Sequence, residues 1–191
     1  MVGTNQDDGI ILTSVLITNP ILYWVYRNFW TLMAPGILFH RPIDETTNED
    51  KTKVVQLADF YLGGTANMIE DNYQNITQMF TDAFVTYAVE CFVKHAKETQ
   101  QVYHYIYSYN GEYGLTQDEG LPNLGVNHAD ELYLQWSSLF GSEHVLNEED
   151  AAMSTLLMEL WADFIILSTP GKGWEPATSG KYMRQVKNRN P

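Results

Sequence analysis

Two short segments of the sequence place titratable side chains in turns, where catalytic groups are often found. The first is VGTNQDDG at residues 2–9, in which a strand end runs into a turn with Asp7 and Asp8 at its apex. The second is GVNHADEL at residues 125–132, in which His128 leaves a glycine-rich loop. Carboxylates and imidazole are groups that general acid–base catalysis uses. Both segments also have a plain interpretation, because Asp-Asp-Gly is a common turn and loop histidines are commonly structural or surface residues.

The elements that must position these segments follow an α/β pattern. Tyrosines at every second position of residues 101–109 predict a strand directly before the glycine-rich loop 110–127. A short helix-like run at residues 128–140 comes next. Helix, strand, glycine-rich loop and helix is the order in which α/β proteins present functional loops at the carboxyl ends of strands.

Three longer helices are also predicted. One opens at Asn48 and ends at Gly63-Gly64, and one covers residues 77–97 with apolar side chains at every fourth position. The last begins after Asn147 and stops before Thr169-Pro-Gly. Only one clear strand lies among them, so either strands escape the pattern or most of the sheet belongs to sequence that is not present.

Length and composition limit the possible function classes. A chain of 191 residues with 45% hydrophobic and 18% charged residues fits one globular domain and excludes disordered and collagen-like proteins. A net charge of −13 makes nucleic acid and anionic lipid poor partners, because both require a basic surface. The single cysteine, Cys91, excludes an internal disulfide and a Cys/His zinc site. We predict no metal and no cofactor.

The acidic residues are concentrated in one part of the chain. Between Glu98 and Gly171 there is no Lys or Arg, while Asp and Glu recur throughout. A solvated acidic surface is the simplest interpretation. The alternatives are a negative field that steers cationic substrates toward a pocket, and a surface that contacts a protein partner.

The beginning of the chain has no feature of a signal peptide, since it lacks a positively charged region followed by an apolar one. Residues 9–26 carry no charge, but they are interrupted by small polar residues and proline, and Arg27 ends them. We therefore predict a buried or pocket-lining segment here and no membrane span.

In their order along the chain, these segments resemble type B carboxylesterases and cholinesterases. GVNHADELYLQW is similar to the histidine motif of that family, and GTNQDDG is similar to its acid motif. VYHYIYSYNGEYG resembles the strand before the histidine loop, and LNEEDAAMSTLLMELWADFIILSTPGKGWEP resembles the terminal helix and its flank. The likeness covers nearly the whole chain.

The resemblance implies an α/β-hydrolase fold, in which a serine on a Gly-x-Ser-x-Gly turn is followed by an acid and then a histidine. By that match Asp8 is the acid, where the family usually has Glu, and His128 is the base. Asp130 and Glu131 are candidate supporting groups, or simply charges at a helix start. The sequence contains no Gly-x-Ser-x-Gly and no run of glycines after a histidine that could form an oxyanion hole.

We therefore expect residues 1–191 to be the C-terminal fragment of a single carboxylesterase-type domain, mostly helices around a few strands of a sheet whose remainder is absent. The implied activity is that of a serine carboxylic-ester hydrolase acting on a small-molecule ester, with the N-terminal part of the same fold as partner. The chain alone is expected to be inactive. The alternatives are a non-catalytic cholinesterase-like adhesion or binding protein, and a small acidic domain that folds and acts alone.

Two further features bear on the site and the location. The aromatic residues Tyr23, Trp24, Phe29 and Trp30 follow the acid turn, in a region that covers the active-site gorge in the family, so they are candidates for the substrate pocket. Packing in the core is the alternative. Asn75-Ile-Thr is an N-glycosylation sequon, which has meaning if the parent protein is secreted, as many relatives are. We expect a secreted or extracellular location.

Overall fold

The structure is a computed structural model that describes residues 1–191 except 66–71, 137, 140–141, 172, 178–182 and 188–191. The chain divides into two compact units. Met1–Asp8 and Thr86–Pro191 form the first unit, and Gly9–Val85 form the second. Asp8 and His128 both belong to the first unit.

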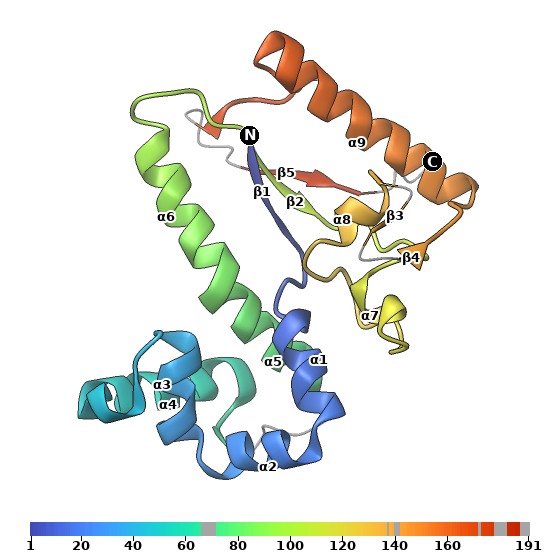
Figure 1. The fold of residues 1–191 in the computed structure, drawn as a ribbon. Coiled ribbons are helices and arrows are strands. Elements are labelled where there is room, and N and C mark those ends of the chain that lie inside the picture. The colour runs from blue at the N-terminus through green and yellow to red at the C-terminus, as the bar shows by residue number, and fades with distance from the viewer. Residues whose placement is uncertain (66–71, 137, 140–141, 172, 178–182, 188–191) are drawn as a thin grey trace. The chain divides into compact units, whose positions relative to one another are not determined.

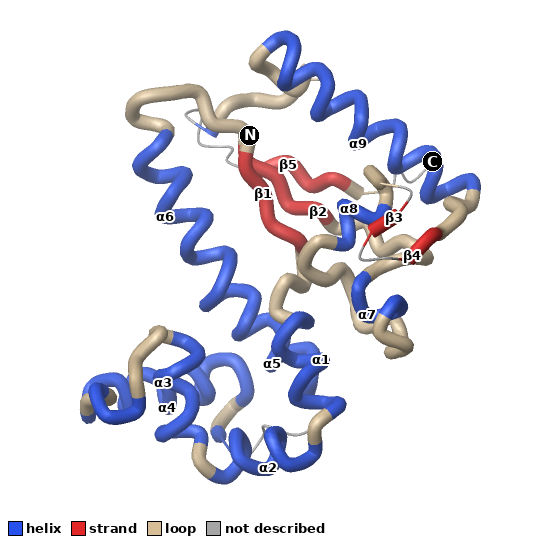
Figure 2. Tube along the Cα trace, viewed as in Figure 1, coloured by secondary structure: helices blue, strands red, loops and turns tan. Residues whose placement is uncertain are grey.

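A three-stranded parallel sheet organises the first unit (Figure 1, Figure 2). Strand β2 (His104–Tyr107) lies between β1 (Val2–Asn5) and β5 (Met183–Val186). In the register, His104 is opposite Val2 on one side and Met183 on the other. Because the strands are parallel, the segments that leave their carboxyl ends meet at one edge of the sheet.

One face of the sheet packs against the terminal helix α9 (Glu148–Leu167). The alternating tyrosines predicted for the strand are buried together on this face, at positions 103, 105, 107 and 109. They contact a cluster that includes Met153, Leu157 and Leu160 of α9. Asn147 caps the helix, since its side chain accepts a hydrogen bond from Asp150 N at 2.8 Å. The predicted strand and terminal helix are thus confirmed.

The opposite face of the sheet packs against helix α6 (Tyr87–Ala96). Val93 of α6 is buried against Val102 at the start of the tyrosine strand, and Val2 of β1 packs onto the same cluster. Successive residues of the two strands therefore face different helices. Because each face of the sheet is covered by a helix, both faces are apolar.

The second unit is helical. It contains α1 (Ile10–Thr18), α2 (Pro20–Asn28), α3 (Trp30–Leu38), the 3-10 turn η1 (Ile43–Glu45), α4 (Asn48–Leu62) and α5 (Tyr73–Thr81). The predicted helix at Asn48 is confirmed as α4, with Thr47 and Asp50 forming a reciprocal cap and Gly63 ending the helix at a φ of 70°. The core of this unit is formed by residues of all five helices, α1 to α5.

The helix predicted at residues 77–97 consists of three successive segments. Helix α5 starts earlier than expected, at Tyr73, and is followed by a π-helical turn, η4 (Asp82–Thr86), and then by α6. A π turn contains one more residue than an α-helical turn. Apolar residues at every fourth position therefore continue through η4, and the sequence pattern does not reveal the change from α-helix to π-helix.

Several strands do escape the sequence pattern, which is one of the two alternatives given above, and the elements around the histidine differ from expectation. Strand β5 and the short antiparallel pair β3 (Ser138–Leu139) and β4 (Ser142–Glu143) were not foreseen. The central residues of β5 are polar, so this strand shows no alternation of apolar and polar residues. Strands β3 and β4 have two residues each and are too short for a periodic pattern. The helix expected at 128–140 is only α8 (Asp130–Tyr133), and the glycine-rich loop contains the turn α7 (Leu115–Asp118).

The uncharged segment 9–26 forms parts of two helices. Within the described residues, no single helix combines the length and apolar composition of a membrane span, and α1 and α2 pass such a test only as a pair bent by 108°. One side of α1 is buried at Ile10 and Leu16, whereas Ile21 and Trp24 of α2 are exposed.

The glycine that follows Asp8 has a steric reason. Helix α5 approaches Gly9 so closely that a Cβ there would lie 2.3 Å from Thr77 O and 2.6 Å from Thr81 N. Gly9 N also donates to Thr81 Oγ1 at 2.9 Å. Position 9 therefore admits no side chain unless the helix moves.

Candidate active site

Strand β1 carries the acid turn to the carboxyl edge of the sheet. Gly3 lies directly against the ring of Tyr105, since a Cβ on Gly3 would be 2.2 Å from that ring. Asp8 then turns inward and is only 2% exposed. Its Oδ2 accepts a hydrogen bond from Asn5 N at 2.8 Å, which closes the turn across three residues.

The histidine loop is held by its own side chains and backbone. Asn127 is buried, its Oδ1 accepts from His128 N at 2.7 Å, and its N donates to Asp130 Oδ2 at 2.6 Å. Ala129 then adopts a φ of 69°, a left-handed conformation that non-glycine residues adopt rarely. This reversal lets helix α8 begin immediately after the histidine.

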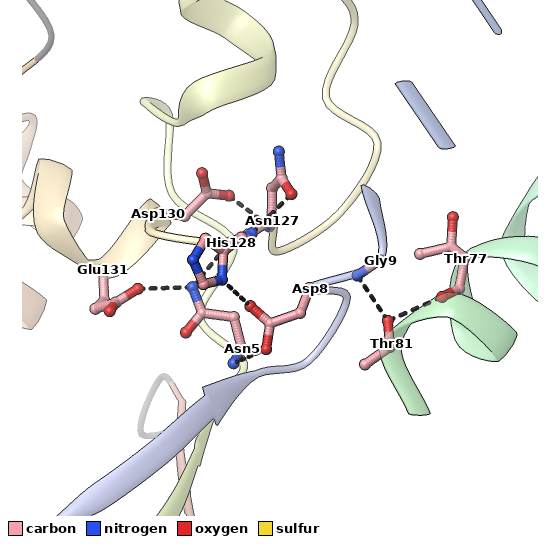
Figure 3. Close-up of polar contacts among 9 residues, drawn as sticks. All are labelled: Asn5, Asp8, Gly9, Thr77, Thr81, Asn127, His128, Asp130 and Glu131. Carbon is pink, nitrogen blue, oxygen red and sulfur yellow. Dashed lines mark hydrogen bonds and ion pairs between the residues drawn. The ribbon is translucent and has the colours of Figure 1, made fainter. Parts of the chain in front are cut away.

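The two predicted residues meet in the first unit. His128 Nδ1 lies 2.8 Å from Asp8 Oδ1, although 120 residues separate them in the sequence (Figure 3). The carboxylate is buried, whereas the imidazole side chain is 55% exposed. A buried acid bonded to Nδ1 keeps the proton on that nitrogen and leaves Nε2 as the basic nitrogen of the neutral ring.

The surroundings of His128 favour its charged form. The hydrogen bond that His128 donates to Asp8 raises the pKa of His128 above its ordinary value, and partial burial opposes that effect. The charges of Asp8, Glu131 and Asp130 raise the pKa further. An imidazolium that forms during a proton transfer would therefore be stabilised at this position.

Asp7 has a different partner from Asp8. Asp7 Oδ2 accepts from Val126 N at 3.0 Å, and Asp7 N donates to Val126 O at 3.0 Å. Burial raises the pKa of Asp7. The structure thus brings Asp8 to the imidazole and Asp7 to the backbone of the histidine loop.

Asp130 and Glu131 both contact the loop that carries the histidine. Asp130 is buried and accepts from Leu115 N at 2.9 Å in addition to Asn127 N, so it joins α7 to the loop. Burial outweighs these two bonds and raises the pKa of Asp130 to about 7. Glu131 Oε2 accepts from Asn5 Nδ2 at 2.6 Å. Neither carboxylate is hydrogen-bonded to the His128 ring in the described contacts.

Asp130 should make the stability of the chain depend on pH. Its folded-state pKa is higher than that of an unfolded Asp, so the folded state holds the proton more tightly. This contribution to stability is full below about pH 4 and is lost as the pH rises through about 7. We expect Asp130→Asn to flatten the fall in the free energy of unfolding between these values, measured by urea titration at several pH values. Glu119→Gln, which removes an exposed carboxylate of the same unit, is the control variant.

Asn5 was not identified from the sequence. Its side chain is buried, and Nδ2 donates both to Glu131 Oε2 and to Asn127 O at 2.6 Å. The available signal was a polar residue at the end of a strand that also begins the acid motif, which is a weak signal without knowledge of what lies opposite.

The aromatic candidates for the substrate pocket have mixed surroundings within the second unit. Trp30 is in the core, and its Nε1 donates to Val54 O at 2.8 Å, while Tyr23 packs against the same core. Trp24 and Phe29 are 56% and 46% exposed and form an edge-to-face pair with centroids 5.7 Å apart. Core packing therefore accounts for Trp30, and a role in a pocket stays a prediction for the others.

The sequon lies in the first turns of α5. Asn75 is exposed and its Nδ2 donates to Asn72 Oδ1 at 2.6 Å. The hydroxyl of Thr77 is buried and donates to Thr13 Oγ1 at 2.9 Å. Only the asparagine of the sequon is thus accessible in the folded chain.

The carboxylates of the acidic stretch differ in burial. Asp130 and Asp150 are buried and hydrogen-bonded, and Glu131 and Asp163 are partly buried. Seven others are exposed, namely Glu112, Asp118, Glu119, Glu143, Glu148, Glu149 and Glu159. Among the described residues, no three His, Cys, Asp or Glu side chains are grouped so that they could hold a metal ion.

Comparisons with known proteins agree with this arrangement. The sequence profile of the Carboxylesterase family matches residues 1–190. The chain is 24% identical to juvenile hormone esterase of Tribolium castaneum over 182 residues, covering 89% of this chain and 30% of that protein. It is 25% identical to esterase E4 of Myzus persicae, over 89% of this chain and 31% of that protein. The chain therefore spans about a third of the length of these relatives.

The fold has a solved counterpart. A crystal structure of juvenile hormone esterase from Manduca sexta, with OTFP covalently attached, matches 98% of this chain and 36% of that one, with a TM-score of 0.71 and 17% identity. The expected fold class, part of an α/β-hydrolase, is confirmed by this likeness and by the parallel sheet with its helices. With a family profile that matches nearly its whole length, the chain belongs to the carboxylesterase family.

Proposed function

We propose that these 191 residues are the C-terminal part of a serine carboxylic-ester hydrolase domain and supply its acid, Asp8, and its histidine, His128. The observation that carries the proposal is the 2.8 Å contact between His128 Nδ1 and the buried Asp8 carboxylate. Membership of the carboxylesterase family supports an ester as the substrate. The nucleophile and the oxyanion hole would come from sequence outside these residues, since they contain no Gly-x-Ser-x-Gly.

The proposed mechanism assigns one role to each side of the imidazole. His128 Nε2 takes the proton from the serine hydroxyl as the oxygen attacks the ester carbonyl, and returns that proton to the leaving alcohol. A water molecule then repeats the same steps on the acyl-enzyme. Asp8 accepts a hydrogen bond from the Nδ1–H group of His128, which fixes the tautomer and stabilises the imidazolium. The raised pKa of His128 is what this stabilisation requires.

The alternative is an adhesion or binding protein that has the fold without the chemistry. Adhesion does not require a buried carboxylate that orients an exposed imidazole, so the Asp8–His128 pair favours the hydrolase. The exposed carboxylates of the acidic stretch would suit either a partner surface or a field that attracts cationic esters. An extracellular location also stays a prediction, and its basis is the sequon with the exposed Asn75.

A fluorophosphonate probe tests the proposal. The polypeptide translated from the complete reading frame should be labelled on a serine in a Gly-x-Ser-x-Gly turn and should hydrolyse a p-nitrophenyl ester. The 191-residue chain by itself should be neither labelled nor active. If the complete polypeptide folds and is not labelled, the hydrolase proposal is wrong and the binding protein is favoured.

A further inference from the structure

Asn5 is hydrogen-bonded both to Asp8 and to the loop that carries His128. Its backbone N donates to Asp8 Oδ2 at 2.8 Å, on the oxygen that the histidine does not use. Its side-chain Nδ2 donates to the carbonyl oxygen of Asn127, the residue directly before His128, at 2.6 Å. Strand β1 thereby fixes the acid through its main chain and the histidine loop through a side chain (Figure 3).

The second bond of the Asn5 amide anchors the other side of the histidine. Nδ2 also donates to Glu131 Oε2 at 2.6 Å, and Glu131 lies in α8, just after His128. Both N–H groups of the Asn5 amide are therefore used, one by the residue before His128 in the sequence and one by a residue after it. Asn5 is 5% exposed and Asn127 is 1% exposed, so loss of the bond between them would leave a buried carbonyl with Asp130 N, at 3.2 Å, as its remaining donor.

The chemistry of the site explains why an amide suits this position. Asp8, Asp130 and Glu131 all act on His128 as negative charges. A carboxylate at position 5 would be repelled by Glu131 and by the Asn127 carbonyl, and an aliphatic side chain would offer no donor. A neutral group with two donors joins these acceptors without adding charge near the imidazole.

We propose that Asn5 is a positioning residue that sets where His128 lies relative to Asp8, by tying the histidine loop and α8 to the end of β1. This role deepens the proposed function and rests on it for its catalytic meaning. The distance from the acid to the ring is then decided by the tether as well as by the acid itself.

The test compares two asparagine substitutions in the full chain. Asn5→Ala removes the tether. Asn147→Ala removes the cap at the start of α9, where the Asn147 side chain, like that of Asn5, bonds to a glutamate and to a backbone group. The pKa of His128 is read from an NMR titration of its ring protons, alongside the melting temperature. We expect both variants to melt earlier, but only Asn5→Ala to lower the pKa of His128, because its hydrogen bond to Asp8 is weakened. A folded Asn5→Ala variant with an unchanged pKa would overturn the proposal.

Two substitutions at Glu131 test the same tether from its other end, and decide the matter if Asn5→Ala does not fold. Glu131→Gln removes the charge but keeps an oxygen that can accept from Asn5, whereas Glu131→Ala removes both. We expect the Nδ1 proton of His128 to exchange with water as slowly in Glu131→Gln as in the parent chain, and faster in Glu131→Ala. Equal exchange in the two variants would count against the tether.

Activity provides a separate readout in the complete polypeptide. Asn5→Ala should lower kcat by about 10- to 100-fold with little change in KM, as expected when a reacting group is displaced and substrate contacts are kept. Asn147→Ala should leave kcat unchanged. If the complete polypeptide is never labelled by the probe, the hydrolase proposal fails while the NMR result still decides the tether. If it is labelled and Asn5→Ala matches Asn147→Ala in kcat and pKa, the tether fails alone.

Discussion

Replacing His128 by alanine in the polypeptide of the complete reading frame is expected to lower ester hydrolysis on the order of a millionfold, the loss seen when the base of a serine hydrolase triad is removed. The physical reason is that a serine hydroxyl is a poor nucleophile unless a base takes its proton during the attack. Fluorophosphonate labelling should fall in parallel, because the probe reacts with the same activated serine. Both quantities are measured on the folded variant, checked by its thermal transition.

A second histidine provides the matched control. His95 is exposed on α6, and its Nδ1 contacts the backbone oxygen of Cys91 at 2.7 Å within the same helix. His95→Ala therefore removes the same kind of side chain without disturbing Asp8 or the histidine loop, and labelling should stay at the parent level. Normal labelling of His128→Ala would show that this histidine is not the base.

Replacing Asp8 by asparagine is expected to lower kcat by about 10,000-fold, as the equivalent change does in a well-studied serine protease triad. The asparagine amide keeps the size of the side chain but carries no negative charge. The Nδ1–H group of His128 then lacks a charged acceptor, so the ring can adopt the wrong tautomer and the imidazolium is not stabilised. The pKa of His128 should fall, since the hydrogen bond that its ring donates to Asp8 is the largest cause of the elevation. The lower limb of the pH–rate profile should accordingly move to lower pH while the plateau drops.

Asp7 makes this test specific because it is the adjacent residue and has the same side chain. Asp7→Asn alters the bond to Val126 N and leaves the Asp8–His128 contact in place. We expect a loss in kcat of about tenfold at most, the lower end of what residues that support a catalytic ligand contribute. If Asp7→Asn were as damaging as Asp8→Asn, the assignment of the acid would have to be revised.

Local patterns in the sequence predicted the elements that have strong periodicity and clear ends. The alternating tyrosines gave the central strand and the buried face that packs on α9. The helix α4 was recognisable because a polar start and two glycines marked its limits. Strand β5 was missed because its residues, Met183 to Val186, show no alternation and become a strand only through pairing with β2.

The pairing of Asp8 with His128 was expected from the resemblance more than from spacing, and their catalytic roles stay a prediction. The order of the acid and histidine motifs singled out Asp8 and His128, and the fold brings them within 2.8 Å of one another. The different partners of Asp7 and Asp8 could not be derived, because a turn places neighbouring side chains in directions that depend on what surrounds them. Asn5 was overlooked for the same reason, since its acceptors lie more than 120 residues away in the chain.

By itself, the sequence determined the family, the main helices and the two residues to which we assign acid–base chemistry, because these depend on residue type, local order and short-range periodicity. Only the tertiary structure decided the register of the parallel sheet, the backbone partner of Asp7, and which neutral residue ties the two loops together. These features depend on contacts between segments that are distant in the chain, and such contacts form only when the strands pair and bring their carboxyl ends to one edge.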